Sequence, residues 1–225
     1  MPITVGSPTQ ATQVAEVDAK SALRISSRPL DHGSLGHYRV THRALLANTK
    51  AANARIFELR NTGTNFIVPT RLIVTLYQTA AGTAQMAGLD FFKCTSFSAV
   101  DTTNTVTPTA SQKKTTGMTA SPGGAAVRGV TVAGAAAGMT GGTLTKDGGA
   151  FAAITYAVAA AAGTSTAAQW GPYDILPKIG ADGTHPFVFA QNEGLEIENR
   201  TLNTTSFGVE ITVDLSWAEV ATTVI

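Results

Sequence analysis

Four histidines are the first residues in this chain whose type could support chemistry. They are His32, His37, His42 and His185, and the first three are spaced by five residues. Because successive side chains of a β-strand alternate between its faces, a spacing of five places neighbouring histidines on opposite faces. Neither a cysteine pair nor a helical HExxH pattern accompanies them. We therefore expect no metal site.

Three glutamates close together in the sequence are the next candidates. Glycoside hydrolysis needs two carboxyl groups that converge on one bond, and Glu193, Glu196 and Glu198 are near neighbours in the chain. Glu196 and Glu198 fall on the same face of a short alternating run, and we expect that face to be exposed to solvent. We predict no catalytic residue, and a hydrolase using Glu193 or Glu196 is kept as an alternative. The remaining isolated carboxylates stand in unrelated contexts: Asp90, Asp101, Asp174 and Asp182.

Other site motifs are absent or ambiguous. The sequence has no G-x-S-x-G elbow and no phosphate loop of the G-x-x-x-x-G-K-[ST] type, so we predict no cofactor. Trp170 and Tyr173 flank a Gly-Pro pair and would suit either a platform for a sugar ring or a plug at the end of a β-sandwich. The single cysteine, Cys94, is expected to be a small core residue.

Composition limits the classes of partner. The 225 residues carry a net charge of +1, and only 14% are charged, against about 25% in a typical globular chain. We therefore expect no nucleic-acid partner, and Lys113-Lys114 is interpreted as part of a solvated loop. No apolar run approaches the roughly 20 residues of a membrane span, and the N-terminus lacks the pattern of a signal peptide. We expect a protein made in a cytoplasm that stays soluble or assembles there, without a membrane partner.

The C-terminal region carries the clearest structural signal. Hydrophobic and polar residues alternate over 209–217, with Val209, Ile211, Val213 and Leu215 on one face and Glu210, Thr212 and Asp214 on the other. A period of two is the signature of a half-buried antiparallel strand. The shorter run 194–198 precedes it, and the turn-forming segment 199–206 separates the two. The simplest interpretation is a long C-terminal β-hairpin.

A similar pattern occurs earlier in the chain, where a Gly/Thr/Asn turn separates residues 57–62 from 66–77. One constant offset in the numbering relates Leu72, Val74 and Leu76 to Ile211, Val213 and Leu215, and nearly the same offset relates Asn61 to Asn199. Common ancestry and two unrelated hairpins that obey one pattern are both open explanations. Either way, two long hairpins predict two facing sheets.

The remaining segments complete the predicted organisation. Residues 1–31 are predicted to be an extended N-terminal arm, with short strands at 14–19 and 22–25, because they contain too few apolar residues for a core of their own. Residues 32–225 are predicted to be a single domain. Its region 100–149 is rich in Thr, Gly and Ala. We predict that this region is a loop-rich insertion that projects from the sandwich or lies on a partner.

The predicted fold is all-β: an antiparallel β-sandwich, jelly-roll-like, with helix content under about 15%, against a base rate near one third. The Ala-rich run 151–162 is compatible with a helix, but Ile154, Tyr156 and Val158 alternate, which favours a strand.

Several short motifs resemble a group of tailed-bacteriophage virion proteins. The main one is the run HPFVFAQNEGL at 185–195, followed by the closing strand end LSWAEV at 215–220. The N-terminal part adds EVDA at 16–19, ALR at 22–24, RP at 28–29 and GHYR at 36–39. The resemblance covers both ends, about a third of the chain, and region 80–180 departs from it.

The resemblance implies a structural component of the virion near the capsid, and not an enzyme. We expect a capsid decoration or cement protein that forms a homotrimer, binds the major capsid protein on the surface of the head and is assembled in the host cytoplasm. The alternative is a minor capsid, head-fibre or tail adsorption protein that binds a host surface glycan.

Overall fold

The computed structural model describes residues 3–4, 14–15, 34–46, 48–112, 123–131, 136–160, 168–176, 186–204 and 206–221. The chain divides into two compact units, Met1–His32 and Gly33–Ile225. Every regular element in the described ranges is a strand, which confirms the predicted all-β class. Within these ranges no helix is long and apolar enough to cross a membrane.

The described residues of the first unit form a pair of short strands. β1 (Ile3–Thr4) and β2 (Val14–Ala15) are antiparallel, with Ile3 opposite Ala15. Val14 and Ala15 begin the strand predicted at 14–19. The remainder of that segment and the strand predicted at 22–25 lie outside the described residues.

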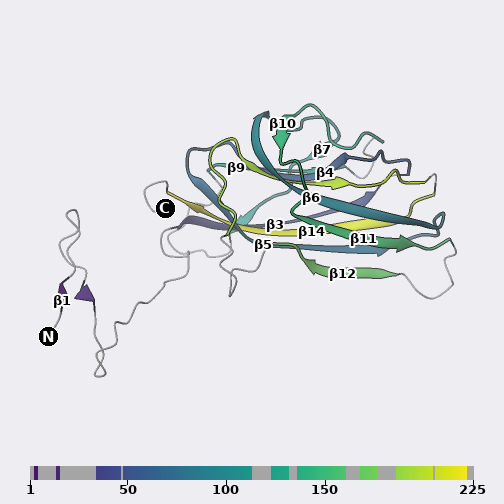
Figure 1. Cartoon of the computed structure of the whole chain (residues 1–225), viewed down its shortest axis with the longest axis horizontal. Coiled ribbons are helices and arrows are strands. Elements are labelled where there is room, and N and C mark those ends of the chain that lie inside the picture. The colour runs from purple at the N-terminus through teal and green to yellow at the C-terminus, as the bar shows by residue number, and fades with distance from the viewer. Residues whose placement is uncertain are drawn as a thin grey trace, which may run out of the picture. The chain divides into compact units, whose positions relative to one another are not determined.

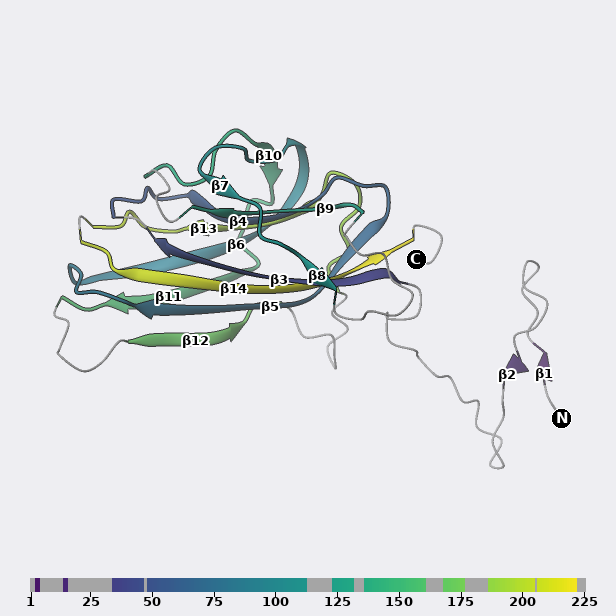
Figure 2. The same ribbon diagram turned by 180° about the vertical axis from the view of Figure 1, so that it is seen from behind.

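The second unit is a sandwich of two antiparallel sheets, which Figure 1 and Figure 2 show as two layers from opposite sides. The larger sheet has the order β10-β6-β13-β4-β9-β7, and β11 also pairs with β6. It consists of β4 (Ala54–Asn61), β6 (Gln85–Ala99), β7 (Thr105–Val106), β9 (Ala125–Val130), β10 (Thr143–Lys146), β11 (Ala152–Val158) and β13 (Gly194–Asn199). The smaller sheet has the order β12-β5-β14-β3-β8. It consists of β3 (Ser34–Leu46), β5 (Phe66–Gln78), β8 (Ser111–Gln112), β12 (Gln169–Asp174) and β14 (Val209–Val220). The finer assignment, a jelly roll, stays a prediction.

β14 lies at the centre of the smaller sheet and follows the predicted alternation. Val209, Ile211, Val213 and Leu215 are fully buried in the core between the sheets, while the polar residues between them are partly exposed. β11 likewise forms within the run 151–162, as the alternation favoured. Its buried positions are Ile154, Tyr156 and Val158. Both results confirm that a period of two reports which face of a strand meets the core.

The two predicted hairpins are wrong. β4 belongs to the larger sheet and β5 to the smaller one, and β13 and β14 divide in the same way. The turn-forming segments therefore serve as corners between sheets. At each corner an asparagine side chain holds the bend: Asn61 Nδ2 donates to Asn65 O at 2.6 Å, and Asn199 Nδ2 donates to Asn203 Oδ1 at 3.1 Å. Alternation describes the faces of a strand but not its partner, so the two facing sheets were predicted correctly and the pairing was not.

The repeated pattern corresponds to a local two-fold arrangement. Val74 lies opposite Val213, its counterpart in the repeat. Glu58 lies opposite Glu196. These two glutamates are also counterparts, because each lies three residues before the asparagine of its corner, Asn61 or Asn199. The hydrogen bonds repeat as well, since Asn53 N donates to Asn199 O and Asn192 N donates to Asn61 O, at 2.6 and 2.8 Å. Asn53 and Asn192 both adopt positive φ, at 61° and 68°. The structural repeat is therefore present, and common ancestry stays a hypothesis.

The region 100–149 is built into the sandwich where the structure describes it. β9 pairs with β4, β7 pairs with β9, and β10 pairs with the end of β6. β8 adds to β3 in the other sheet. The prediction that this region projects from the sandwich is wrong for these residues, because short Thr- and Ala-rich strands find partners that their own sequence does not reveal.

Candidate functional site

The centre of the larger sheet carries charged residues on the face that points away from the core. On β4 and β13, Phe57, Leu59, Leu195 and Ile197 are buried in the core between the sheets. The intervening residues point to the opposite face, and this places glutamates of the two strands side by side. Every residue of β13 is buried, so both faces of this strand are covered.

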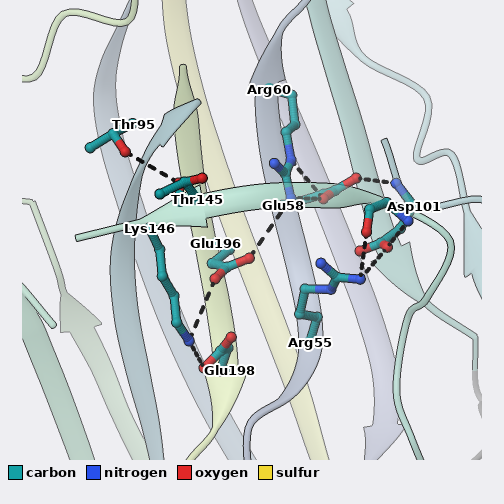
Figure 3. A network of polar contacts seen from close by, with 10 residues as sticks. Arg55, Glu58, Arg60, Thr95, Asp101, Thr145, Lys146, Glu196 and Glu198 are labelled. Atoms are coloured by element: carbon teal, nitrogen blue, oxygen red, sulfur yellow. Dashed lines mark hydrogen bonds and ion pairs between the residues drawn. The ribbon is translucent and has the colours of Figure 1, made fainter. Parts of the chain in front are cut away.

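We call the charged residues at this place the buried charge cluster. Its members are Arg55, Glu58 and Arg60 of β4, Glu196 and Glu198 of β13, Lys146 of β10, and Asp101 (Figure 3). The side chains of Glu58, Arg60 and Glu196 have 0% exposure. The prediction that Glu196 and Glu198 lie on a solvent face is therefore wrong, although they do share a face.

Segments from the region 100–149 and the end of β6 help to enclose the cluster. β10 contributes Lys146, whose Nζ lies 4.1 Å from the centre of the Phe92 ring. The Arg60 guanidinium carbon lies 4.8 Å from the centre of the Phe97 ring. Aromatic faces attract cations, so each ring shields its cation from water and still interacts favourably with it.

One half of the cluster is closely paired. Arg60 Nη2 lies 2.6 Å from Glu58 Oε2, and Arg60 Nε donates to the same oxygen at 2.8 Å. The backbone N–H of Asp101 donates to Glu58 Oε1 at 3.0 Å. Asp101 Oδ1 in turn accepts hydrogen bonds from Arg55 Nη2 at 2.7 Å and from the backbone N–H of Gly142 at 2.8 Å. These contacts tie β4 to the covering segments.

In the other half of the cluster, only one of the two glutamates has a cation close by. Lys146 Nζ lies 2.6 Å from Glu198 Oε2. Glu196 has only distant cations, with Arg60 Nη2 at 3.8 Å and Lys146 Nζ at 3.9 Å. Neither Glu196 oxygen has a hydrogen-bond donor among the described residues.

Burial shifts the titration of these groups. It raises the pKa of Glu58, while the nearby Arg60 opposes that shift. Burial also raises the pKa of Glu196 to about 7, and the charge of Glu198 adds to the effect. Both shifts follow from the cost of placing a charge where water cannot solvate it.

The three predicted glutamates have different environments. Glu193 Oε2 accepts the backbone N–H of Ala190 and closes the turn before β13. Glu196 has no exposed surface, so a substrate cannot reach its carboxyl group in this conformation. The structure thus brings Glu196 and Glu198 together. Glu198 also lines an open pocket of about 220 Å³, together with Arg55 and Thr140. Sequence reasoning missed Glu58 and Arg60, although the shared pattern around Asn61 and Asn199 could have indicated that Glu58 and Glu196 are equivalent.

The described histidines do not converge. His37 and His42 lie on opposite faces of β3, as their spacing predicts, and both are buried. The ring of His42 packs 6.0 Å from that of Phe57, and burial lowers its pKa. His32 and His185 lie outside the described residues, and the described part of the chain contains no cluster of possible metal ligands.

Trp170 and Tyr173 are half-buried and pack against the core, with the Trp170 ring 5.3 Å from that of Tyr156. This arrangement favours the plug over the sugar platform. An open groove of about 640 Å³ lies instead on the outer face of the smaller sheet. Its lining includes Thr75, Tyr77, Thr212, Pro172, Arg43 and Glu210.

Cys94 is fully buried, as predicted, but it borders the buried charge cluster. Its pKa is raised to about 12, first by burial and then by the charge of Glu196. Lys113-Lys114 and Asp182 lie outside the described residues. No family model, curated protein or solved structure matches this chain, so its function must be inferred from the fold and the site.

Proposed function

We propose that this chain is a structural protein of a bacteriophage virion that binds the outside of the head as a decoration or cement protein. In this proposal it is not an enzyme. Its partner is the major capsid protein, it acts as a homotrimer on the capsid surface, and it stabilises the contacts between capsomers.

The division of the chain into a sandwich and a separate N-terminal unit is the observation that supports this proposal most directly. The described core clusters consist of residues of Gly33–Ile225. A segment that forms its own compact unit and contains short strands suits attachment to the sheet edge of another subunit.

The motif behind the resemblance has a structural role in this fold. Phe189 pairs with Ile67 of the smaller sheet through two backbone hydrogen bonds, at 3.0 and 2.8 Å. Asn192, with positive φ, then turns the chain into β13. The described part of HPFVFAQNEGL therefore joins the two sheets.

The proposal is tested with heads of a phage whose genome encodes this chain but whose copy of the gene has been deleted. The purified protein should sediment with these heads and raise the temperature at which they release their DNA. Particle images should show it on the head surface. Sedimentation with isolated tails instead, and not with heads, would contradict decoration.

A variant that lacks residues 1–32 should keep a strand-dominated circular dichroism spectrum and lose at least tenfold in affinity for heads. The expectation follows from the proposal that the N-terminal unit attaches to a partner, while the described core clusters consist of residues of Gly33–Ile225. Unchanged affinity would show that the sandwich itself is the anchor. Loss of the folded spectrum would show that the segment belongs to the sandwich.

The groove on the smaller sheet favours the alternative, a minor capsid, head-fibre or tail adsorption protein that binds a host surface glycan. Hydroxyl and charged side chains line it beside Tyr77, which is 37% exposed. Such a lining suits hydroxyl-rich ligands. Under this alternative, Tyr77→Ala should abolish binding to host cells, whereas Tyr173→Ala, on the neighbouring strand but packed against the core, serves as the matched control.

A further inference from the structure

The buried charge cluster has one more acidic group than basic groups. Four carboxyl groups belong to it, and three cations accompany them. The carboxyl groups are Glu58, Asp101, Glu196 and Glu198, and the cations are Arg55, Arg60 and Lys146. A buried negative charge without a partner is costly, because neither water nor a cation compensates it.

The contacts identify the carboxyl group that lacks a cation. Glu58 is paired with Arg60, Asp101 with Arg55 and Glu198 with Lys146, each at 2.6 or 2.7 Å. Glu196 lies farther from both of its nearest cations, at 3.8 and 3.9 Å, with neither oxygen hydrogen-bonded to a donor in the described residues. The carboxyl group of Glu198 lies within hydrogen-bonding reach of it.

Among the described residues, the other ionisable groups around the pair do not supply the missing charge. From β6, Asp90 lies opposite Glu198 and is matched by Arg200, whose Nη2 is 2.5 Å away. The Cys94 thiol, also on β6, remains neutral at physiological pH because burial raises its pKa to about 12. On the β4 side, Glu58 and Arg60 already compensate one another. On the β10 side, Lys146 is engaged by Glu198.

We propose that the Glu196–Glu198 pair is a buried proton-binding site, in which one shared proton takes the place of a fourth cation. Two adjacent carboxyl groups that cannot both ionise retain one proton between them. The proton comes from solvent and forms an O–H bond on one carboxyl group that donates to the other, so the cluster as a whole is neutral.

The direction of the pKa shift agrees with this arrangement and determines the pH dependence. The pKa of Glu196 rises from 4.5 to about 7 on folding. A raised acid pKa means that the folded state holds the proton more tightly than the unfolded state does. The stabilisation is therefore complete below pH 4.5, declines as the pH rises toward 7 and is absent above that. Between these values the folding constant should fall about tenfold per pH unit from this group alone.

Denaturation of the full chain and of its Glu196→Gln variant, from pH 4.5 to pH 9, tests the proposal. Glutamine retains the shape and remains neutral at every pH. The ratio of the variant's folding constant to that of the natural protein should therefore rise by about 100-fold or more between pH 4.5 and pH 8. Glu198→Gln should give the same trend, since either substitution removes the excess carboxyl group. Glu210→Gln, on the outer face of the other sheet, is the matched control and should leave the ratio constant.

Infrared spectroscopy of the natural protein and of one variant, Lys146→Met, detects the proton at the same site directly. A protonated carboxyl band should be present at pH 6 and absent at pH 9, and Lys146→Met should move its midpoint to higher pH. The proposal is overturned if that band is absent at pH 6, or if the ratio for Glu196→Gln does not change with pH. A folding constant that rises with added Ca²⁺ and is insensitive to pH would assign the site to a metal cation and would also overturn it.

Discussion

Replacement of Arg60 by methionine should lower the free energy of unfolding by about 3–5 kcal/mol, the range observed when one partner of a buried ion pair is removed. Arg60 has 0% side-chain exposure and is the cation closest to Glu58. It is also one of the two cations near Glu196. Methionine keeps much of the volume beside Phe97 but leaves Glu58 buried without its charge partner. Chemical denaturation at pH 7 measures the loss.

The cost of Arg60→Met should also depend on pH. Burial already raises the pKa of Glu58, and Arg60 is the main influence that opposes this shift. Without Arg60 the carboxyl group should retain a proton to higher pH, so the destabilisation should be smaller at pH 5 than at pH 8.

The matched control is Arg43→Met on the outer face of the smaller sheet. Arg43 also pairs with a glutamate, Glu210, but its side chain is 71% exposed. Exposed ion pairs contribute about 0–1 kcal/mol, so this substitution should have little effect. Equal losses for Arg60→Met and Arg43→Met would show that the buried charge cluster contributes no more than a surface pair.

The second large effect is expected at Val213. Val213 is fully buried at the centre of the smaller sheet, between Val74 and His42 on the adjacent strands. Val213→Asp forfeits roughly 1.5–3 kcal/mol of side-chain burial and adds the larger cost of an unpaired buried carboxylate. His42 offers no compensation, because burial lowers its pKa and favours the neutral ring. Since a domain is stable by only about 5–15 kcal/mol, we expect no folded protein.

Two controls separate the causes of that loss, and soluble yield with circular dichroism measures all three variants. Val213→Thr keeps the shape of valine, so it should fold with reduced stability. Thr212→Asp places the same charge one residue earlier, on the partly exposed face opposite Arg43, and should be tolerated. If Val213→Asp and Thr212→Asp are tolerated equally, the assigned faces of β14 are incorrect.

The sequence by itself determined the fold class and the faces of the longest strands. The alternation at 209–217 identified the buried positions of β14, and the run 151–162 was correctly predicted as a strand. These predictions succeed because side chains that alternate across a strand record a local property, namely which face meets the core. The same property placed Glu196 and Glu198 on a common face.

Tertiary structure alone decided strand partners and what covers the outer face of the larger sheet. The turn-forming segments after Asn61 and Asn199 could close a hairpin or cross between sheets, and only the packing of the two sheets selects the crossing. Glu196 is buried because Lys146, which is distant in the sequence, reaches the same place from β10, and because Arg60 does so from β4. The sequence of a short alternating run does not indicate which distant residues will cover its polar face. Burial of that face depends on tertiary contacts, and these form only when the chain folds.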